Sequence, residues 1–149
     1  MNTLEYKLKA MKIAIINGPN LNLTGKREPQ YYGVVTFDTY IESLKSKFPD
    51  VQFTYFQTNI EGELINFLHK AGFDHDGIIL NPGGYTNTSV AIGDAVASIA
   101  APVVEVHISN IHAREEFRKI SHVSAKCSGT ITGFGLAGYE LAMRSFTLR

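Results

Sequence analysis

The sequence predicts an α/β fold in which a parallel sheet of five strands lies between two layers of helices. Short runs rich in Ile and Val alternate along the chain with longer stretches whose apolar residues recur at helical spacing. The short runs do not alternate strictly between apolar and polar residues, which is typical of strands buried on both faces of a parallel sheet. Right-handed crossovers between such strands produce a doubly wound, three-layer sandwich.

The elements can be placed by residue range. The candidate strands are 12–16, 51–56, 77–80, 103–106 and, more weakly, 129–133. The candidate helices are 37–48, 60–71, 88–100 and 135–146. In the first helix Phe37, Ile41 and Leu44 share one apolar stripe, as expected for a helix that packs on a sheet. Five strands favour the flavodoxin-like order 2-1-3-4-5 over a six-stranded dinucleotide-binding fold.

Length and composition exclude several classes of protein. The 149 residues suit one domain, predicted over 11–149 after an N-terminal extension, 1–10. Fourteen Lys and Arg balance fourteen Asp and Glu, so a general nucleic-acid binder, which needs a basic face, is not expected. A single cysteine, Cys127, allows no intramolecular disulfide or thiolate metal cluster and favours the cytoplasm. No apolar run approaches the ~20 residues of a membrane span.

Polar, turn-forming residues follow four of the predicted strands. These clusters are 17–20, 57–59, 81–87 and 105–110. Turn chemistry alone explains one or two such clusters. In doubly wound folds ligands bind beyond the carboxyl ends of the strands, so four clusters at one edge of the sheet indicate a binding site.

Two pairs of residues in the last of these regions suggest acid–base chemistry and anion binding. Glu105 and His107 are two apart on a strand, so their side chains share a face, where the carboxylate can orient the imidazole and favour its protonated form. A hydrogen-bonded pair at a strand end is the alternative. Arg114 and Arg118 are four apart, on one face of a predicted helix, and suit a carboxylate ligand. The two glutamates between them are equally typical of a charged surface helix.

The connection 23–33 is long and carries a cation, Arg27, and a phenol, Tyr32. Long connections without regular structure are often lids over active sites, although a plain surface loop is an equal alternative. Farther on, residues 133–138 match G-x-G-x-x-G. That fingerprint belongs to the first βα unit of dinucleotide-binding folds, whereas here it lies in the last one, so we interpret the glycines as close helix–strand packing.

Several motifs stand in order along the chain and together resemble one family. They are Gly18-Pro19-Asn20-Leu21-Asn22, Arg27-Glu28-Pro29 with Tyr32-Gly33, Glu61-Gly62-Glu63-Leu64, Asn81-Pro82-Gly83, Glu105-Val106-His107-Ile108-Ser109-Asn110 and His112-Ala113-Arg114-Glu115. From about Met11 onward the chain resembles the type II 3-dehydroquinate dehydratases. The resemblance implies a flavodoxin-like subunit that converts 3-dehydroquinate to 3-dehydroshikimate in the shikimate pathway. It also implies a homododecamer built from trimers, and neither a metal nor an organic cofactor.

The resemblance assigns roles in an elimination that passes through an enolate. Tyr32 is implied as the base, and Arg27 as the cation that activates it. Asn20 would stabilise the enolate through a bound water. His107, oriented by Glu105, would protonate the departing hydroxyl.

Further residues are implied in substrate binding: Asn81, Asn87, Asp94, Ile108, Ser109, Arg114 and Arg118. By the same resemblance Asn81 and the backbone amides of Ile108 and Ser109 would hold substrate oxygens. Arg118 would bind a substrate hydroxyl, Arg114 would help to organise the site, and Asp94 would act across the subunit boundary.

Magnitudes constrain the activation of the phenol. Lowering a phenolic pKa from about 10 to about 7 requires roughly 4 kcal/mol. A cation at about 4 Å contributes ~1 kcal/mol in water but ~4 kcal/mol at an effective dielectric constant of 20. Activation by Arg27 therefore requires that the site excludes most water, which a closing lid would provide.

Three positions depart from the family pattern. Asn87 stands where the family usually has His, which predicts weaker substrate binding, and Asn87→His is then expected to lower KM. Gly93 stands where Arg is common and places a poor helix former inside a helix, at about 1 kcal/mol relative to Ala. Ile60 replaces a frequent His.

Three rival functions stay open at this stage. Asn87 allows a dehydratase that acts on a related cyclic hydroxy acid. A flavodoxin-like module for a nucleotide or flavin is supported only by the 133–138 motif. A protein that serves only assembly or regulation is disfavoured because Asn20, Arg27, Tyr32 and His107 are all present.

Overall fold

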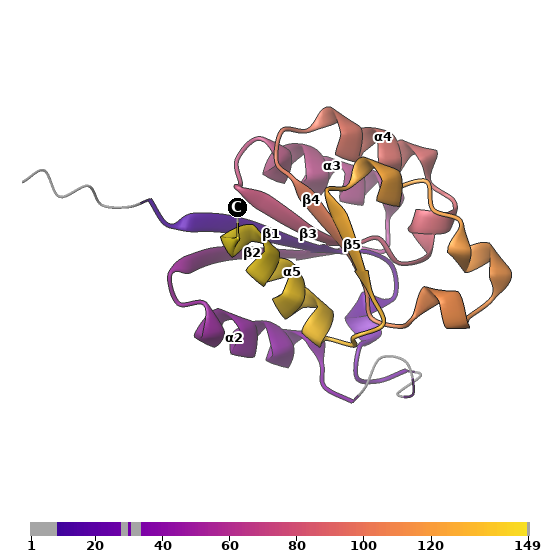
Figure 1. Ribbon diagram of the computed structural model, residues 1–149, viewed down its shortest axis with the longest axis horizontal. Coiled ribbons are helices and arrows are strands. Elements are labelled where there is room, and N and C mark those ends of the chain that lie inside the picture. The colour runs from indigo at the N-terminus through magenta and orange to yellow at the C-terminus, as the bar shows by residue number, and fades with distance from the viewer. Residues whose placement is uncertain (1–8, 28–29, 31–33, 149) are drawn as a thin grey trace, which may run out of the picture.

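A parallel five-stranded sheet forms the centre of the molecule (Figure 1). The structure, a computed structural model, describes residues 9–27, 30 and 34–148. The strands are β1 (Met11–Asn17), β2 (Val51–Gln57), β3 (Gly77–Asn81), β4 (Val103–His107) and β5 (Gly129–Thr132). Their order is β2-β1-β3-β4-β5 with every neighbouring pair parallel, so the predicted fold class and order are confirmed.

Two helices cover each face of the sheet (Figure 1). The helices α2 (Phe37–Lys47) and α5 (Ala137–Thr147) lie on one face, and α3 (Glu61–Gly72) and α4 (Val90–Ser98) lie on the other. The helix predicted at 88–100 begins at Val90 because Ser89 caps it, its side chain accepting a hydrogen bond from the amide of Ile92 at 3.0 Å, and it ends at Ser98. None of the helices in the described part of the chain is long and apolar enough to cross a membrane.

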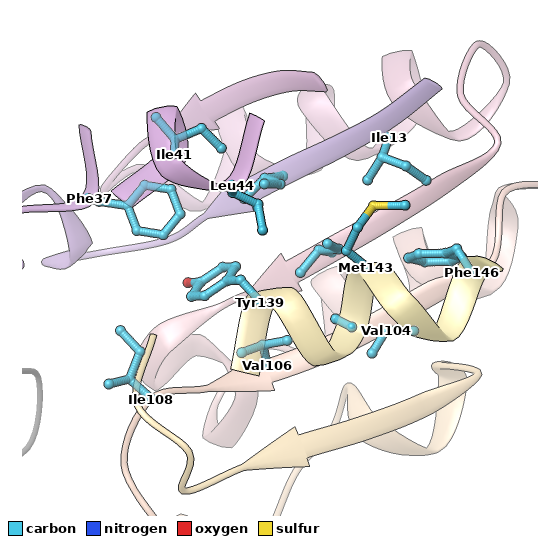
Figure 2. Packing of buried hydrophobic residues seen from close by; sticks show 13 residues of the cluster. Ile13, Phe37, Ile41, Leu44, Val104, Val106, Ile108, Tyr139, Met143 and Phe146 are labelled. Carbon is cyan, nitrogen blue, oxygen red and sulfur yellow. The ribbon is translucent and has the colours of Figure 1, made fainter. Parts of the chain in front are cut away.

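The central strand β1 supplies both hydrophobic cores. Ile13 and Ile15 point into the layer of α2 and α5, whereas Ala14 and Ile16 point into the layer of α3 and α4. All four side chains are fully buried, as the near-continuous apolar run predicted. Figure 2 shows the first core, in which residues of α2 and α5 meet Ile13 over the sheet.

The glycines of the 133–138 motif allow close packing and positive φ angles in the turn that precedes α5. A Cβ on Gly138, in α5, would lie 3.1 Å from the Cγ1 of Val106 in β4, so the glycine lets the helix approach the strand closely. Gly133 and Gly135 have φ angles of +94° and +62°, a region that glycine adopts without strain. The interpretation as helix–strand packing is therefore confirmed at Gly138, while the other two glycines shape the turn that precedes the helix.

Gly93 corrects an expectation from the sequence. A Cβ at this position in α4 would lie 2.2 Å from the backbone oxygen of His122, closer than any real contact. The glycine is therefore required by the close approach of the 122 backbone. Describing it as a poor helix former that Ala would improve is wrong for this fold, because overpacking outweighs the gain in helix propensity.

Gly93→Ala is expected to lower the free energy of unfolding by about 2 kcal/mol through this overpacking. The matched control is Gly62→Ala in α3, where a Cβ meets no atom within 4 Å. That variant is expected to raise the free energy of unfolding by about 0.5–1 kcal/mol, the difference in helix propensity. Urea unfolding of both variants measures the contrast, and equal changes in both would contradict the steric explanation.

Candidate active site

A pocket of about 160 Å³ opens where the carboxyl ends of β1, β3 and β4 meet. It brings together nine of the site residues expected from the sequence: Asn20, Arg27, Asn81, Asn87, His107, Ile108, Ser109, Arg114 and Arg118. The cluster that follows β2 contributes no lining residue. Its Asn59 is exposed outside the pocket, and its Oδ1 accepts a hydrogen bond from the amide of Asn20 at 3.0 Å. Three polar strand ends therefore converge on the site, and the fourth supports one of them.

Two expected residues do not line the pocket, and a third lies outside the described part of the chain. Glu105 is buried behind His107 and does not line the pocket. Asp94 is exposed on α4 and is not part of the pocket of this single chain. Tyr32 lies outside the described residues, as does part of the connection 23–33 that was expected to form a lid.

The Glu105–His107 pair is the centre of the site's hydrogen bonding. The Nε2 of His107 lies 2.7 Å from the Oε1 of Glu105, in a position where both side chains are almost fully buried. The hydroxyl of Thr86 donates to the same carboxylate oxygen at 2.5 Å, and the hydroxyl of Ser124 donates to Oε2 at 2.5 Å. The carboxylate is thus satisfied by partners from three separate segments, as a buried charge requires.

These contacts determine the protonation of Glu105. Burial alone raises the pKa of a carboxyl group, but the hydrogen bond and charge of His107, with the hydroxyls of Ser124 and Thr86, hold the pKa of Glu105 below its usual value. Glu105 is therefore an anion at neutral pH. Its hydrogen bond fixes one ring nitrogen of His107 and so holds the imidazole in place as a candidate proton donor to a ligand in the pocket that it lines.

Arg114 and Arg118 both line the pocket, but they do not lie on one helix as the sequence predicted. The expectation that Arg114 and Arg118 share one helical face is wrong, because two short 3₁₀ turns, Ile111–Ala113 and Glu116–Lys119, replace the predicted helix. The Nε of Arg118 instead donates to the Oε2 of Glu115 at 2.6 Å, and the Nε of Arg114 lies 3.9 Å from the same oxygen. One carboxylate thus holds both guanidinium groups beside the pocket, where they can attract an anionic substrate.

A second network holds the ends of β1 and β3 together. The phenol of Tyr139 donates to the Oδ1 of Asn17 at 2.7 Å and accepts from the Nδ2 of Asn81 at 3.0 Å. The Oδ1 of Asn81 accepts from the amide of Gly83 at 3.1 Å. Burial raises the pKa of Tyr139, so its phenol stays neutral and serves as a structural link. This residue was missed because its position in the helix is typical of core packing.

The turn after β1 presents the remaining polar group. Asn20 has a φ of 70°, the only positive φ at a non-glycine position in the described ranges. Asparagine tolerates this left-handed conformation better than most residues. The bend leaves Asn20 at the pocket rim, and Arg27 lines the same pocket from farther along the connection.

The described side chains do not favour metal binding or thiolate chemistry. Within the described ranges no group of three or more His, Cys, Asp or Glu side chains is arranged to hold a metal ion. Burial, together with the charge of Glu105, raises the pKa of Cys127 to about 12, so this thiol is not a thiolate nucleophile near neutral pH.

The fold and the pocket together define a class of protein. A buried carboxylate that orients a histidine, placed beside two arginines at the carboxyl edge of a doubly wound sheet, is typical of an acid–base enzyme acting on a small anion. The family described as Dehydroquinase class II matches residues 11–147. The chain belongs to this family, as its motifs predicted.

Individual relatives are similar to this chain in sequence and structure over nearly its whole length. The chain is 57% identical over 136 residues to a 3-dehydroquinate dehydratase of Exiguobacterium sp., which covers 91% of this chain and 93% of the relative. It is 51% identical over 138 residues to the protein of the same name from Fusobacterium nucleatum, covering 89% and 94%. The crystal structure of the type II dehydroquinase from Butyrivibrio crossotus superposes with a TM-score of 0.88 at 42% identity, covering 92% and 97%.

Replacing the buried carboxylate is expected to change how stability depends on pH. Because the folded-state pKa of Glu105 is lowered, its contribution is present above the unfolded-state pKa and is lost as pH falls through the folded-state value. Glu105→Gln should therefore cost about 2 kcal/mol at pH 7, and the gap to the wild type should narrow below pH 4.5. Urea unfolding at several pH values measures this gap.

The control is Glu116→Gln, which removes a carboxylate in an exposed pair with Lys119. An exposed pair of this kind contributes little to stability, so this variant should follow the wild type at every pH. A gap for Glu105→Gln that stayed constant with pH would mean that the charge of Glu105 is not what stabilises the fold.

Proposed function

We propose that this pocket removes water from 3-dehydroquinate by an anti elimination that passes through an enolate, without a Schiff base or a metal. The activity is that of a hydro-lyase of the shikimate pathway, and the product is 3-dehydroshikimate. The observation that carries the proposal is the carboxylate-held His107 beside Asn20, Arg27 and the arginine pair in one pocket of a class II dehydroquinase fold.

In the proposed first step a base removes the proton α to the ketone and leaves an enolate. Tyr32 is the proposed base on the strength of the family motif, and it follows the pocket residue Arg27 by five positions. The charge of Arg27 favours the phenolate in a site shielded from water. Asn20, which lines the pocket, is the proposed group that stabilises the enolate oxygen through a bound water.

In the proposed second step the enolate collapses and the carbon–oxygen bond of the departing hydroxyl breaks. The imidazolium of His107 gives its proton to that oxygen, so water leaves and the histidine becomes neutral. Glu105 stays ionised throughout and holds the ring. The proton taken by the base and the proton given by His107 balance, and return of a proton between them through solvent restores the enzyme.

The remaining pocket residues are proposed to bind the substrate. The amides of Ile108 and Ser109 follow β4 directly and face the pocket with Asn81. Arg118 and Arg114 supply positive charge for substrate oxygens. Asn87 lines the same pocket, but its amide donates to the backbone oxygens of Arg118 and Ile120 and is not assigned to the substrate.

A homododecamer built from trimers is proposed as the assembly, with residues 11–149 as its single domain, 1–10 as an extension and a cytoplasmic location. Asp94 is exposed on α4, which supports a role across a subunit boundary better than a role within this pocket. Sedimentation equilibrium should give a mass near twelve chains of 16.4 kDa. A stable monomer with full activity would exclude the shared site.

The chemical proposal is tested by mixing purified protein with 3-dehydroquinate and following the ultraviolet absorbance of the conjugated enone-carboxylate product. The wild type should turn over without added metal and after treatment with borohydride, which traps Schiff bases. Tyr32→Phe and His107→Ala should each lower kcat by at least ~100-fold, the usual contribution of a general base or acid.

Two matched variants separate chemistry from general damage. Tyr31→Phe removes the neighbouring phenol, and His112→Ala removes an exposed histidine outside the pocket; both should keep near-normal turnover. Equal losses in Tyr31→Phe and Tyr32→Phe would remove Tyr32 from its proposed role. No absorbance change with folded wild-type protein would redirect the search to related cyclic hydroxy acids.

A further inference from the structure

Two of the positions that depart from the family pattern touch the same short piece of backbone, the 118–122 segment. The Nδ2 of Asn87 donates to the backbone oxygens of Arg118 at 3.2 Å and Ile120 at 2.8 Å. Gly93 lies under the backbone oxygen of His122, where a Cβ would come within 2.2 Å. The amide of His122 also donates to the backbone oxygen of Thr86 at 2.8 Å. Three hydrogen bonds and one close approach thus hold the 118–122 segment against the turn after β3 and against α4.

The orientation of the Asn87 amide follows from its partners. Two carbonyl oxygens surround the same side-chain atom, and only the NH₂ group can donate to both. A histidine carries at most one hydrogen on each ring nitrogen, and its two N–H bonds point in different directions. It could not donate from one atom to both carbonyls, so the asparagine makes a contact that a histidine in its place could not reproduce.

Gly93 affects the same segment because it has no side chain, which leaves space for the backbone oxygen of His122. Any side chain at this position would push the His122 carbonyl away from α4. Pushing it would also lengthen the hydrogen bond between the His122 amide and Thr86. Gly93 thus leaves the space that the segment occupies, and Asn87 hydrogen-bonds the segment in that place.

The seated segment begins with Arg118, whose guanidinium lines the pocket and pairs with Glu115. We propose that Asn87 is a positioning residue for Arg118: together with Gly93, it seats the 118–122 segment so that the guanidinium meets the substrate. This inference rests on the proposed function. It reverses the expectation from the sequence, because Asn87→His should now raise KM rather than lower it.

The first experiment is a double-mutant cycle on the full-length protein, read as KM and kcat for 3-dehydroquinate. Asn87→Ala and Asn87→His should each raise KM about tenfold, with kcat changed less than about threefold. In an Arg118→Ala background the same changes at Asn87 should add less than about twofold, because the group they position is already absent. Thr88→Ala, an exposed neighbour outside the pocket, is the control and should match the wild type.

Fully additive effects in the cycle would overturn the proposal and make Asn87 a direct substrate contact. A lower KM for Asn87→His would overturn it as well. Gly93→Ala offers a second route to the same segment and should raise KM in the same Arg118-dependent way, provided that folded protein is recovered.

A structural readout keeps this inference separate from the proposed function. Hydrogen exchange at the His122 amide should be about tenfold faster in Asn87→Ala than in Thr88→Ala. Unchanged exchange would overturn the seating even if KM rises. Faster exchange in a protein that does not turn over 3-dehydroquinate would uphold the seating and reject the proposed function alone.

Discussion

The pocket depends on the buried carboxylate of Glu105. Its two oxygens join Thr86, Ser124 and His107, so one charge connects the turn after β3, the end of β4 and the segment that leads into β5. A buried anion is stable only when such partners surround it, and removing one partner leaves the charge uncompensated. The same contacts that satisfy Glu105 therefore hold the walls of the pocket together and orient its histidine.

Close packing of the backbone also holds the ends of β1 and β3 together. A Cβ on Gly18 would lie 2.7 Å from the backbone oxygen of Pro82, so the turns after β1 and β3 are in direct contact. Tyr139 reaches from α5 beneath them and joins Asn17 to Asn81. The hydrophobic layer between the sheet and the helices α2 and α5 (Figure 2) surrounds Tyr139 and shields these bonds from water, which strengthens them.

A chain with no net charge can still present a strongly polarised site. The described cations of the pocket, Arg27, Arg114 and Arg118, gather at one edge of the sheet, and the nearest exposed carboxylate, Glu115, is used to hold two of them. The hydrogen bond from Arg118 lowers the pKa of Glu115, so it stays ionised and keeps this arrangement. The balanced overall composition therefore contained no information about this local concentration of positive charge.

By itself the sequence determined the five strands, their order, the helices between them and the strand ends that carry the site. Hydrophobic periodicity and turn residues are local patterns, and the carboxyl ends of parallel strands meet by topology alone. Only the tertiary structure decided that Arg114 and Arg118 occupy separate turns, that Tyr139 joins β1 to β3, and that Gly93 and Asn87 seat the 118–122 segment. These contacts join residues that are far apart in the sequence but only a few ångströms apart in space. Such short distances depend on how the helices pack against the sheet, and a local sequence pattern does not contain that information.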